Sequence, residues 1–435
     1  MNITQTTPAQ SLPEVYRTLQ PDPLTSPEEL KAFYYDGLNQ VRGGDKVQRL
    51  AQGLNRDHGV TSFKAFFMGH QGVGKSTELS RLGLQVADKF QIIRFSALNN
   101  LDPRNFKSLD IILTMIVDVA ERTNQLLNKT PSEIRLREIW DWFATEKDTR
   151  EQANSKALTI EGGAGVKADS WWGQILGLFA TLKSEMKFAQ NRKKEIIEYR
   201  FNRLPALIEI ANRILDECNE LLREDRGQEW LFIGEDFDKS AIPRPLIEDL
   251  FINNADVFRK LRVHMILTLP LSLYYSGRAV ELPFANDRCF VLPDTHVFYQ
   301  DHQPNTSGQS AIAELLAARM LPTLFEPDQM ARLILASGGN LRNLFTLTSY
   351  AADTAALRAA TAIGASDVHE AIENLRNEYQ RRLGASPYDR DVITYQDKSD
   401  QLLKIYHGEQ QDQIPNAVVY SLLESRAVQE FNGER

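Results

Sequence analysis

Cysteine is scarce in this chain, and long apolar runs are missing. The 435 residues include two cysteines, Cys218 and Cys289, which lie far apart and lack the spacing of metal ligands. This excludes a disulfide framework and indicates a reducing compartment. No stretch approaches the roughly 20 apolar residues that a membrane-spanning helix needs. Residues 1–20 lack the basic start and apolar run of a signal peptide. The sequence therefore predicts a cytoplasmic protein with no membrane partner.

An excess of positive charge is also missing. The net charge is −8, with 50 Lys and Arg against 58 Asp and Glu. This excludes a global field that would attract nucleic acid indiscriminately, although a local basic patch stays compatible with the composition. A content of 42% hydrophobic and 25% charged residues is typical of globular proteins. The length predicts two or three domains.

Strand and helix patterns alternate along most of the chain. Short apolar runs predict buried strands at residues 63–68, 90–95, 230–233, 263–269 and 288–292. Periodic apolar residues predict helices at residues 26–38, from 75 onward, at 105–126 and at 204–224. This order predicts an α/β fold, a parallel sheet with helices on both faces. From residue 310 to about 382 the pattern is helical throughout.

A phosphate-binding loop follows the first predicted strand. Residues 69–76 read Gly-His-Gln-Gly-Val-Gly-Lys-Ser and fit G-x-x-x-x-G-K-[ST]. Glycines let backbone amides face phosphate oxygens, and the start of the next helix adds positive potential. Lys75 is expected to reach the β- and γ-phosphates, and Ser76 to ligate Mg2+. The predicted ligands are therefore ATP and Mg2+. The predicted nucleotide-binding residues are Gly69, His70, Gln71, Gly72, Val73, Gly74, Lys75, Ser76 and Thr77.

Acidic residues end the strand predicted at 230–233. Glu235 and Asp236 follow it at the carboxyl edge of the sheet, where ligands lie in open α/β folds. A P-loop site needs one carboxylate near the magnesium and often a second that orients the attacking water. We assign Glu235 to the magnesium side and Asp236 to water activation, and their order stays open. Asp238 and Lys239 are expected to pair locally or to contact a neighbouring subunit.

These motifs together resemble the STAND and AAA+ branch of P-loop ATPases, including its origin-recognition-like members. The P-loop and the acidic strand end carry the resemblance. Three further segments add to it: Leu267-Thr268-Leu269-Pro270, Ser337-Gly338-Gly339-Asn340-Leu341-Arg342 and Val41-Arg42-Gly43-Gly44-Asp45. The resemblance spans about residues 30–380 and is sharp only at these motifs.

The resemblance implies further site residues. Thr268 stands in the position of the sensor of the γ-phosphate, and Arg342 in that of a lid arginine that approaches the nucleotide. The segment around Arg42 would lie against the adenine. The family usually writes aspartate first in the acidic pair, whereas this chain has Glu235 and then Asp236. We therefore expect a slow ATPase.

The resemblance also suggests a domain organisation. Residues 1–25 would form a loose N-terminal arm, 26–309 the ATPase core with an insertion at 130–203, and 310–385 a helical lid. Residues 386–435 resemble the beginning of a winged helix, with a helix at 416–425 and a strand at 427–432. Within the insertion, Trp171–Leu182 predicts a helix buried against the core or another subunit, with membrane contact as the alternative that its short length disfavours. The basic stretch 187–203 is interpreted as a solvated helix face, with nucleic-acid binding as the alternative.

Two functions are compatible with this organisation. The first is a nucleotide-operated switch that forms a homo-oligomer through its ATPase core and controls a protein effector, as STAND-like ATPases do in bacterial anti-phage defence. An arginine from the neighbouring subunit would complete its site, with Arg259, Arg262 and Arg278 as candidates. The alternative is a DNA-binding loader or remodeller of the origin-recognition or transposition-regulator kind, with duplex DNA as partner.

Overall fold

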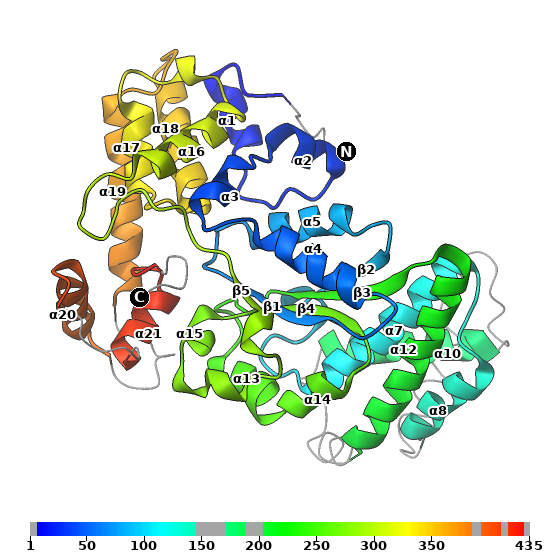
Figure 1. Cartoon of the computed structure of the whole chain (residues 1–435). Helices are drawn as coiled ribbons and strands as arrows, with labels where there is room; N and C mark the ends of the chain where they lie inside the picture. The colour runs from blue at the N-terminus through cyan, green and yellow to red at the C-terminus, as the bar shows by residue number, and fades with distance from the viewer. Residues whose placement is uncertain (1–6, 145–170, 188–202, 385–392, 410–415, 430–435) are drawn as a thin grey trace.

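A five-stranded parallel sheet lies at the centre of the core domain, with the strand order β2-β3-β4-β1-β5 (Figure 1). The computed structural model describes residues 7–144, 171–187, 203–384, 393–409 and 416–429. The strands are β1 (Lys64–Met68), β2 (Phe90–Ser96), β3 (Glu229–Glu235), β4 (His264–Leu269) and β5 (Cys289–Val291). The predicted α/β class and all five predicted strands are confirmed.

Helices cover both faces of this sheet because successive strand residues point to opposite sides. In β1, Ala65 and Phe67 pack with α4 (Lys46–Asp57) and α5 (Lys75–Gln85). Phe66 and Met68 pack on the other face, with α7 (Ser108–Leu127) and α12 (Leu204–Arg226). A strand buried on both faces reads as a continuous apolar run, which is why residues 63–68 are recognisable in the sequence.

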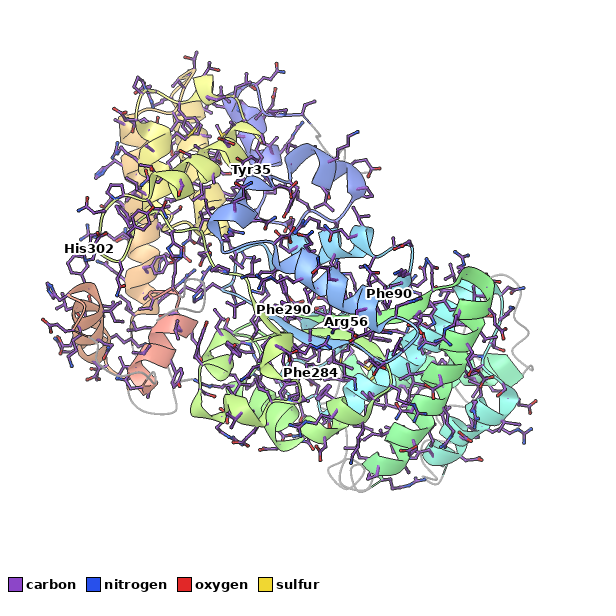
Figure 2. All side chains as sticks on the ribbon, in the orientation of Figure 1. Tyr35, Arg56, Phe90, Phe284, Phe290 and His302 are labelled. Carbon is purple, nitrogen blue, oxygen red and sulfur yellow. The ribbon has the colours of Figure 1, made fainter. Side chains whose placement is uncertain are left out.

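Shorter helices and buried aromatic side chains complete the core around the sheet. Phe284 lies under the sheet in Figure 2, with its ring centroid 4.6 Å from that of Phe66. Phe90 begins the edge strand β2 and is also buried. The remaining core helices are α6 (Ala97–Asn100), α13 (Arg244–Glu248), α14 (Ala255–Lys260) and α15 (Leu271–Tyr274), with a π-helical turn at Asp249–Asn253.

The insertion adds a second helical layer outside α7 and α12. It contains α8 (Glu133–Ala144) and α10 (Trp171–Lys187), with Ile175, Phe179 and Leu182 fully buried. The Lys183 ammonium pairs with Glu121 of α7 at 2.7 Å. The prediction of a helix buried against the core is confirmed, and none of the described helices is long and apolar enough to cross a membrane. Residues 188–202, which carry most of the basic stretch, lie outside the described residues.

The helical lid consists of four helices and includes the N-terminal residues. Its helices are α16 (Thr306–Ala317), α17 (Gln329–Ala336), α18 (Leu341–Leu357) and α19 (Ala365–Arg382). Helix α1 (Leu12–Thr18) packs on α18, and Ala9 forms a parallel bridge with Met320. Leu12, Val15 and Leu19 are buried among the lid's apolar residues. The prediction of a loose arm is therefore wrong for residues 7–24, because one face of α1 buries its apolar side chains in the lid.

Two short helices connect this N-terminal part to the core. Helix α2 (Pro27–Phe33) begins with the predicted capping box, in which Ser26 and Glu29 bond reciprocally. It ends five residues before the predicted limit, at Phe33, and α3 (Gly37–Val41) follows. Figure 1 shows both between the lid and the core. This segment thereby lies next to the P-loop helix α5.

The C-terminal segment contains α20 (Tyr395–Tyr406) and α21 (Ala417–Glu424). Helix α21 rests on the core, where the Tyr420 hydroxyl donates to the carbonyl of Tyr275 and Glu424 pairs with Arg244. The predicted helix at 416–425 is confirmed. The predicted strand at 427–432 is wrong for residues 427–429, which are not strand, and residues 430–432 lie outside the described residues.

The position of α1 predicts a difference between two substitutions on the same helix. Leu12→Ala removes a side chain that is 3% exposed, so we expect the free energy of unfolding to fall by about 2–5 kcal/mol. Tyr16→Ala removes one that is 60% exposed, and its effect should stay within about 0.5 kcal/mol. Urea denaturation measures both. Equal and negligible effects would mean that residues 7–19 are indeed a loose arm.

Candidate functional site

The P-loop connects β1 to α5, as the motif requires. Gly72 and Gly74 have φ of 88° and 105°, the left-handed region that side chains disfavour. The Lys75 ammonium donates to the carbonyls of Gly69 at 2.7 Å and His70 at 2.9 Å. Lys75 is thus folded back over its own loop, at the amino end of α5. The predicted strand, loop and helix context is confirmed.

Glu235 is the last residue of β3 and lies beside the start of α5. Its carboxylate pairs with the guanidinium of Arg94 of β2 at 2.6 Å, because Ser96 and Glu235 are register partners in the two strands. The same guanidinium donates to Ser80 Oγ at 2.7 Å and to the carbonyl of Ser76 at 3.3 Å. Arg94 therefore connects Glu235 to the helix that carries the predicted magnesium ligand Ser76. The sequence analysis missed Arg94, since an exposed residue in the middle of a strand carries no local signal.

Asp236 begins the turn after β3. Its φ is 70°, and the Ser96 hydroxyl donates to its Oδ2 at 2.5 Å. The Lys239 ammonium lies 3.9 Å from the other oxygen, Oδ1. The roles of Glu235 with magnesium and of Asp236 with water remain predictions.

Asp238 pairs with Lys75 and not with Lys239, so the predicted local pair is not formed, and the alternative contact with a neighbouring subunit stays a prediction. The Asp238 side chain is 4% exposed, and its Oδ2 lies 2.8 Å from the Lys75 ammonium. Burial raises the pKa of Asp238, but Lys75 and then Lys239 lower it, and the net direction is below the ordinary value. In the turn of residues 236–239, the Asp238 side chain thus points toward the P-loop, and the Lys239 side chain lies near Asp236. Local sequence spacing predicts neither direction.

The predicted sensor Thr268 is buried in β4, between β1 and β3. Its hydroxyl accepts a hydrogen bond from the backbone amide of Phe237 at 3.2 Å. Thr268 thereby fixes the turn that carries Asp236 and Asp238. Contact between Thr268 and a γ-phosphate remains a prediction.

The first turn of lid helix α18 lies directly against the P-loop. The backbone amide of Arg342 donates to the carbonyl of Gly72 at 3.2 Å. The side-chain amide of Asn340 donates to the carbonyl of Gln71 at 3.1 Å and to Asp294 Oδ1 at 2.9 Å. Burial raises the pKa of Asp294 to about 6, against the attraction of Arg42 and the Asn340 bond. The segment that carries Arg342 therefore lies against the P-loop, while the predicted approach of Arg342 to the nucleotide stays a prediction. Asn340 is a contact that the sequence analysis missed.

Arg42, whose function the sequence left open, is buried beside the P-loop and forms a hydrogen bond with its backbone. It is 2% exposed. Its Nε donates to Thr295 Oγ1 at 2.9 Å, and its Nη1 to the carbonyl of Val73 at 3.3 Å. Arg42 therefore ties the P-loop to the segment between β5 and the lid.

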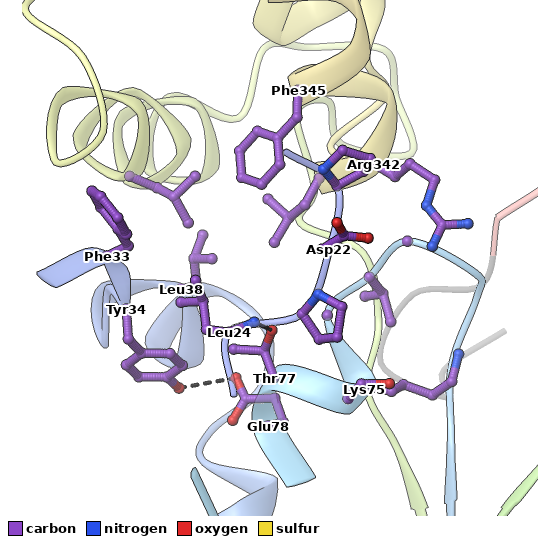
Figure 3. A pocket seen from close by; sticks show the side chains of 18 of the residues that line it. Asp22, Leu24, Phe33, Tyr34, Leu38, Lys75, Thr77, Glu78, Arg342 and Phe345 are labelled. Carbon is purple, nitrogen blue, oxygen red and sulfur yellow. Dashed lines mark hydrogen bonds between the residues drawn. The ribbon is translucent and has the colours of Figure 1, made fainter. Parts of the chain in front are cut away.

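A pocket opens between the P-loop, the lid and the N-terminal part (Figure 3). Its apolar side carries Phe33, Leu38, Leu315, Leu341 and Phe345. Its polar side is the P-loop from Gly72 to Glu78, with Lys239 and Arg342. An apolar recess beside a cationic loop matches the base and the phosphates of a nucleotide.

Residues of the supposed arm also line this pocket. They include Pro21, Asp22, Pro23 and Leu24, and the Leu24 amide donates to Thr77 Oγ1 at 3.1 Å. Figure 3 shows Leu24 beside Thr77, Asp22 above them near Arg342, and below them the Tyr34 hydroxyl bonded to Glu78. No motif in residues 21–24 signals this position.

The geometry fits a nucleoside triphosphate with Mg2+. Glycines in the loop leave its amides open to phosphate oxygens. Gly69 also lets the loop pack closely on the segment after β5, because a Cβ there would lie 2.5 Å from the carbonyl oxygen of Leu292. Ser76 and the Glu235 carboxylate lie on adjacent elements joined by Arg94, and oxygen ligands of this kind suit Mg2+. These residues would hold the ion.

The three arginines proposed to act on a neighbouring subunit all have partners within the chain. Arg259 donates to the carbonyls of Glu281, Leu282 and Pro283. Arg262 pairs with Asp216 at 2.5 Å, and Arg278 with Glu281 at 3.0 Å. Their action in a neighbouring subunit remains a prediction.

Comparisons with known proteins give similarities of fold. A scan against protein-family models finds no match, and a search of curated proteins finds none. Among solved structures, the ORC1 protein of Aeropyrum pernix in complex with DNA is 12% identical, with 94% of this chain and 85% of that chain covered and a TM-score of 0.41. Cdc6p from Pyrobaculum aerophilum is also 12% identical, with coverage of 95% and 89% and a TM-score of 0.40. Drosophila ORC bound to DNA is 10% identical, with coverage of 81% and 70% and a TM-score of 0.37.

The contact between the P-loop and α18 predicts the effect of a methyl group at Gly72. A Cβ there would lie 2.5 Å from Arg342 Cβ and 2.8 Å from Asn340 Oδ1, at a φ of 88°. We therefore expect Gly72→Ala to weaken binding of a fluorescent ATP analogue at least about ten-fold, through displacement of the lid and backbone strain.

Gly277→Ala is the matched control, because nothing lies within 4 Å of its Cβ position. It should bind the analogue like the original chain. Unchanged binding by Gly72→Ala as well would show that the lid contact does not shape the site.

Proposed function

We propose that this protein is a slow ATPase that binds ATP with Mg2+ in the pocket between the P-loop and the helical lid. The observation that carries the proposal is the convergence of three separate parts of the chain on that pocket: the P-loop, residues 21–42 and the first turn of α18. A ligand between these parts contacts all of them at once. Binding would therefore change how the lid sits on the core.

Each polar group of the site then has a defined task. The amides of the P-loop and Lys75 bind the phosphates, and Ser76 with Glu235 holds the ion. Mg2+, when bound, neutralises negative charge on the phosphates and favours attack at phosphorus. Asp236 orients the attacking water, and Thr268 keeps the turn of Asp236 in place through the Phe237 amide. Arg342 approaches the phosphates from the lid.

Slow turnover is consistent with the fact that both acidic residues already have partners within the chain. Glu235 is engaged with Arg94, and Asp236 with Ser96. Both carboxylates must exchange these partners before they act on the ion or on water. The short side chain of Asp236 also reaches a water less easily than a glutamate would.

Nucleotide-dependent assembly and its partners extend this proposal. The DNA-binding alternative agrees with the similar structures better than the effector-controlling switch does, since the Aeropyrum and Drosophila structures contain DNA. A likeness of fold does not show that this chain binds DNA. We therefore propose DNA binding only as the second candidate function. Control of a protein effector and a role in anti-phage defence remain predictions.

Two substitutions test the ATPase. Lys75→Ala removes the cation of the P-loop, and we expect ATP affinity to fall about 100-fold, in line with the loss of charge-assisted hydrogen bonds. Glu235→Gln keeps the shape and removes a charge, so ATP should still bind while turnover falls about 100-fold or more. Titration calorimetry measures binding, and phosphate release measures turnover. Turnover retained by Lys75→Ala would contradict the proposed site.

Assembly separates the two partner hypotheses. Mass photometry of the chain without nucleotide, with Mg2+ and ATP, and with duplex DNA added reports the oligomer in each state. Larger particles with ATP alone support the switch. Particles that form only with ATP and DNA support the DNA-binding alternative, and steep salt dependence should accompany them.

A further inference from the structure

Three carboxylates, Glu235, Asp236 and Asp238, lie within four residues at the end of β3. Each faces a different cation. Glu235 pairs with Arg94 at 2.6 Å, and Asp238 with Lys75 at 2.8 Å. Asp236 faces Lys239, but at 3.9 Å. The first two pairs are at hydrogen-bond distance, and the third is not.

Lys239 is therefore the least engaged cation of this group. Its ammonium makes no hydrogen bond within the part of the chain that the structure describes, and its side chain is 26% exposed. Because the two charged groups lie 3.9 Å apart, beyond hydrogen-bond distance, Asp236 holds Lys239 less firmly than the other two carboxylates hold their cations. Lys239 also lines the nucleotide pocket together with Gly72–Glu78.

Other positive charges surround Lys239. Lys75 and Arg342 both act on its ammonium with like charge. Figure 3 shows Lys75 and Arg342 extending toward the same side of the pocket, one from the P-loop and one from the lid. The guanidinium of Arg342 forms no ion pair with any described residue. Asp238 offsets part of this repulsion, but it is itself paired with Lys75. Lys239 and Arg342 have no carboxylate within hydrogen-bond distance among the described residues, and this leaves the site electrostatically suited to a polyanion.

The sheet order places Lys239 at one end of such a polyanion. Residue 239 follows β3, which β4 separates from the P-loop strand β1. The amides of the loop and the start of α5 lie at the β1 side, where the inner phosphates bind. The end of β3 is where the ion and the attacking water meet the terminal phosphate.

We propose that Lys239 binds the terminal phosphate of the nucleoside triphosphate, as a second lysine beside Lys75. The site then distinguishes a triphosphate from a diphosphate through a cation on the acidic strand end. On binding, Lys239 leaves Asp236, and this carboxylate becomes available for water. This inference rests on the proposed function and assigns Lys239 a ligand-binding role within it.

The test compares two nucleotides on one variant. Lys239→Met should weaken binding of ATPγS with Mg2+ about ten-fold to 100-fold, the usual loss for one charge-assisted hydrogen bond. Binding of ADP should weaken less than about three-fold, since ADP lacks the terminal phosphate. Lys239→Arg should restore most of the ATPγS affinity. Competition against a fluorescent nucleotide measures all these constants.

Lys107→Met is the matched control, because Lys107 is a comparably exposed lysine that pairs with Asp249 at 3.2 Å, outside the pocket. It should leave both affinities unchanged. Equal losses for ATPγS and ADP in Lys239→Met would show that Lys239 only supports the turn, and unchanged affinities that it does not bind nucleotide; either result overturns the inference.

Two further checks keep the outcomes distinct. If Lys239→Met does not fold, judged by circular dichroism, Lys239→Gln replaces it with the same expected ratio. If the original chain binds neither nucleotide, the proposed function itself fails. If it binds both and only the predicted ratio is absent, the inference about Lys239 fails alone.

Discussion

The contact between the first turn of α18 and the P-loop is the constraint on which the site depends. The Gly72 carbonyl accepts a hydrogen bond from the Arg342 backbone amide, and the absence of a side chain at Gly72 lets the lid approach this closely. Asn340 adds a second bond to the loop and a third to Asp294. Because the loop, the lid and the segment after β5 meet here, a ligand that moves the loop also acts on the lid. This arrangement is a physical basis for a nucleotide-controlled conformational change.

Charge pairing at the end of β3 is the second organising feature. Glu235, Asp236 and Asp238 all face cations, and one of these cations is the P-loop lysine itself. The buried pair of Lys75 and Asp238 is costly to break unless both charges find new partners together. Phosphates for the cations and a divalent ion for the carboxylates meet that condition jointly. This pairing supports the proposal that the site takes nucleotide and ion together, and the exchange of partners would slow the proposed turnover.

Local sequence signals predicted the elements but not the contacts between them. The apolar runs of β1 and β3, the glycines of the P-loop and the capping box of Ser26 each carry their information within a few residues, and the structure agrees. The contacts of Arg94, Asn340 and Asp238 depend on strand register, on a turn and on lid docking, which no short motif encodes. Residues 7–24 were wrongly predicted as loose, because a short amphipathic helix beside prolines has a weak pattern. The basic stretch 188–202 lies outside the described residues, so its solvated-face interpretation stays a prediction.

Hydrogen exchange with and without Mg2+ and ATP tests the central claim most directly, namely that a nucleotide binds between the P-loop and the lid. The account predicts simultaneous protection of three separate segments: residues 69–77, residues 21–42 and the first turns of α18. Protection of the loop alone would place the nucleotide outside the lid. Absence of protection in all three would contradict the site.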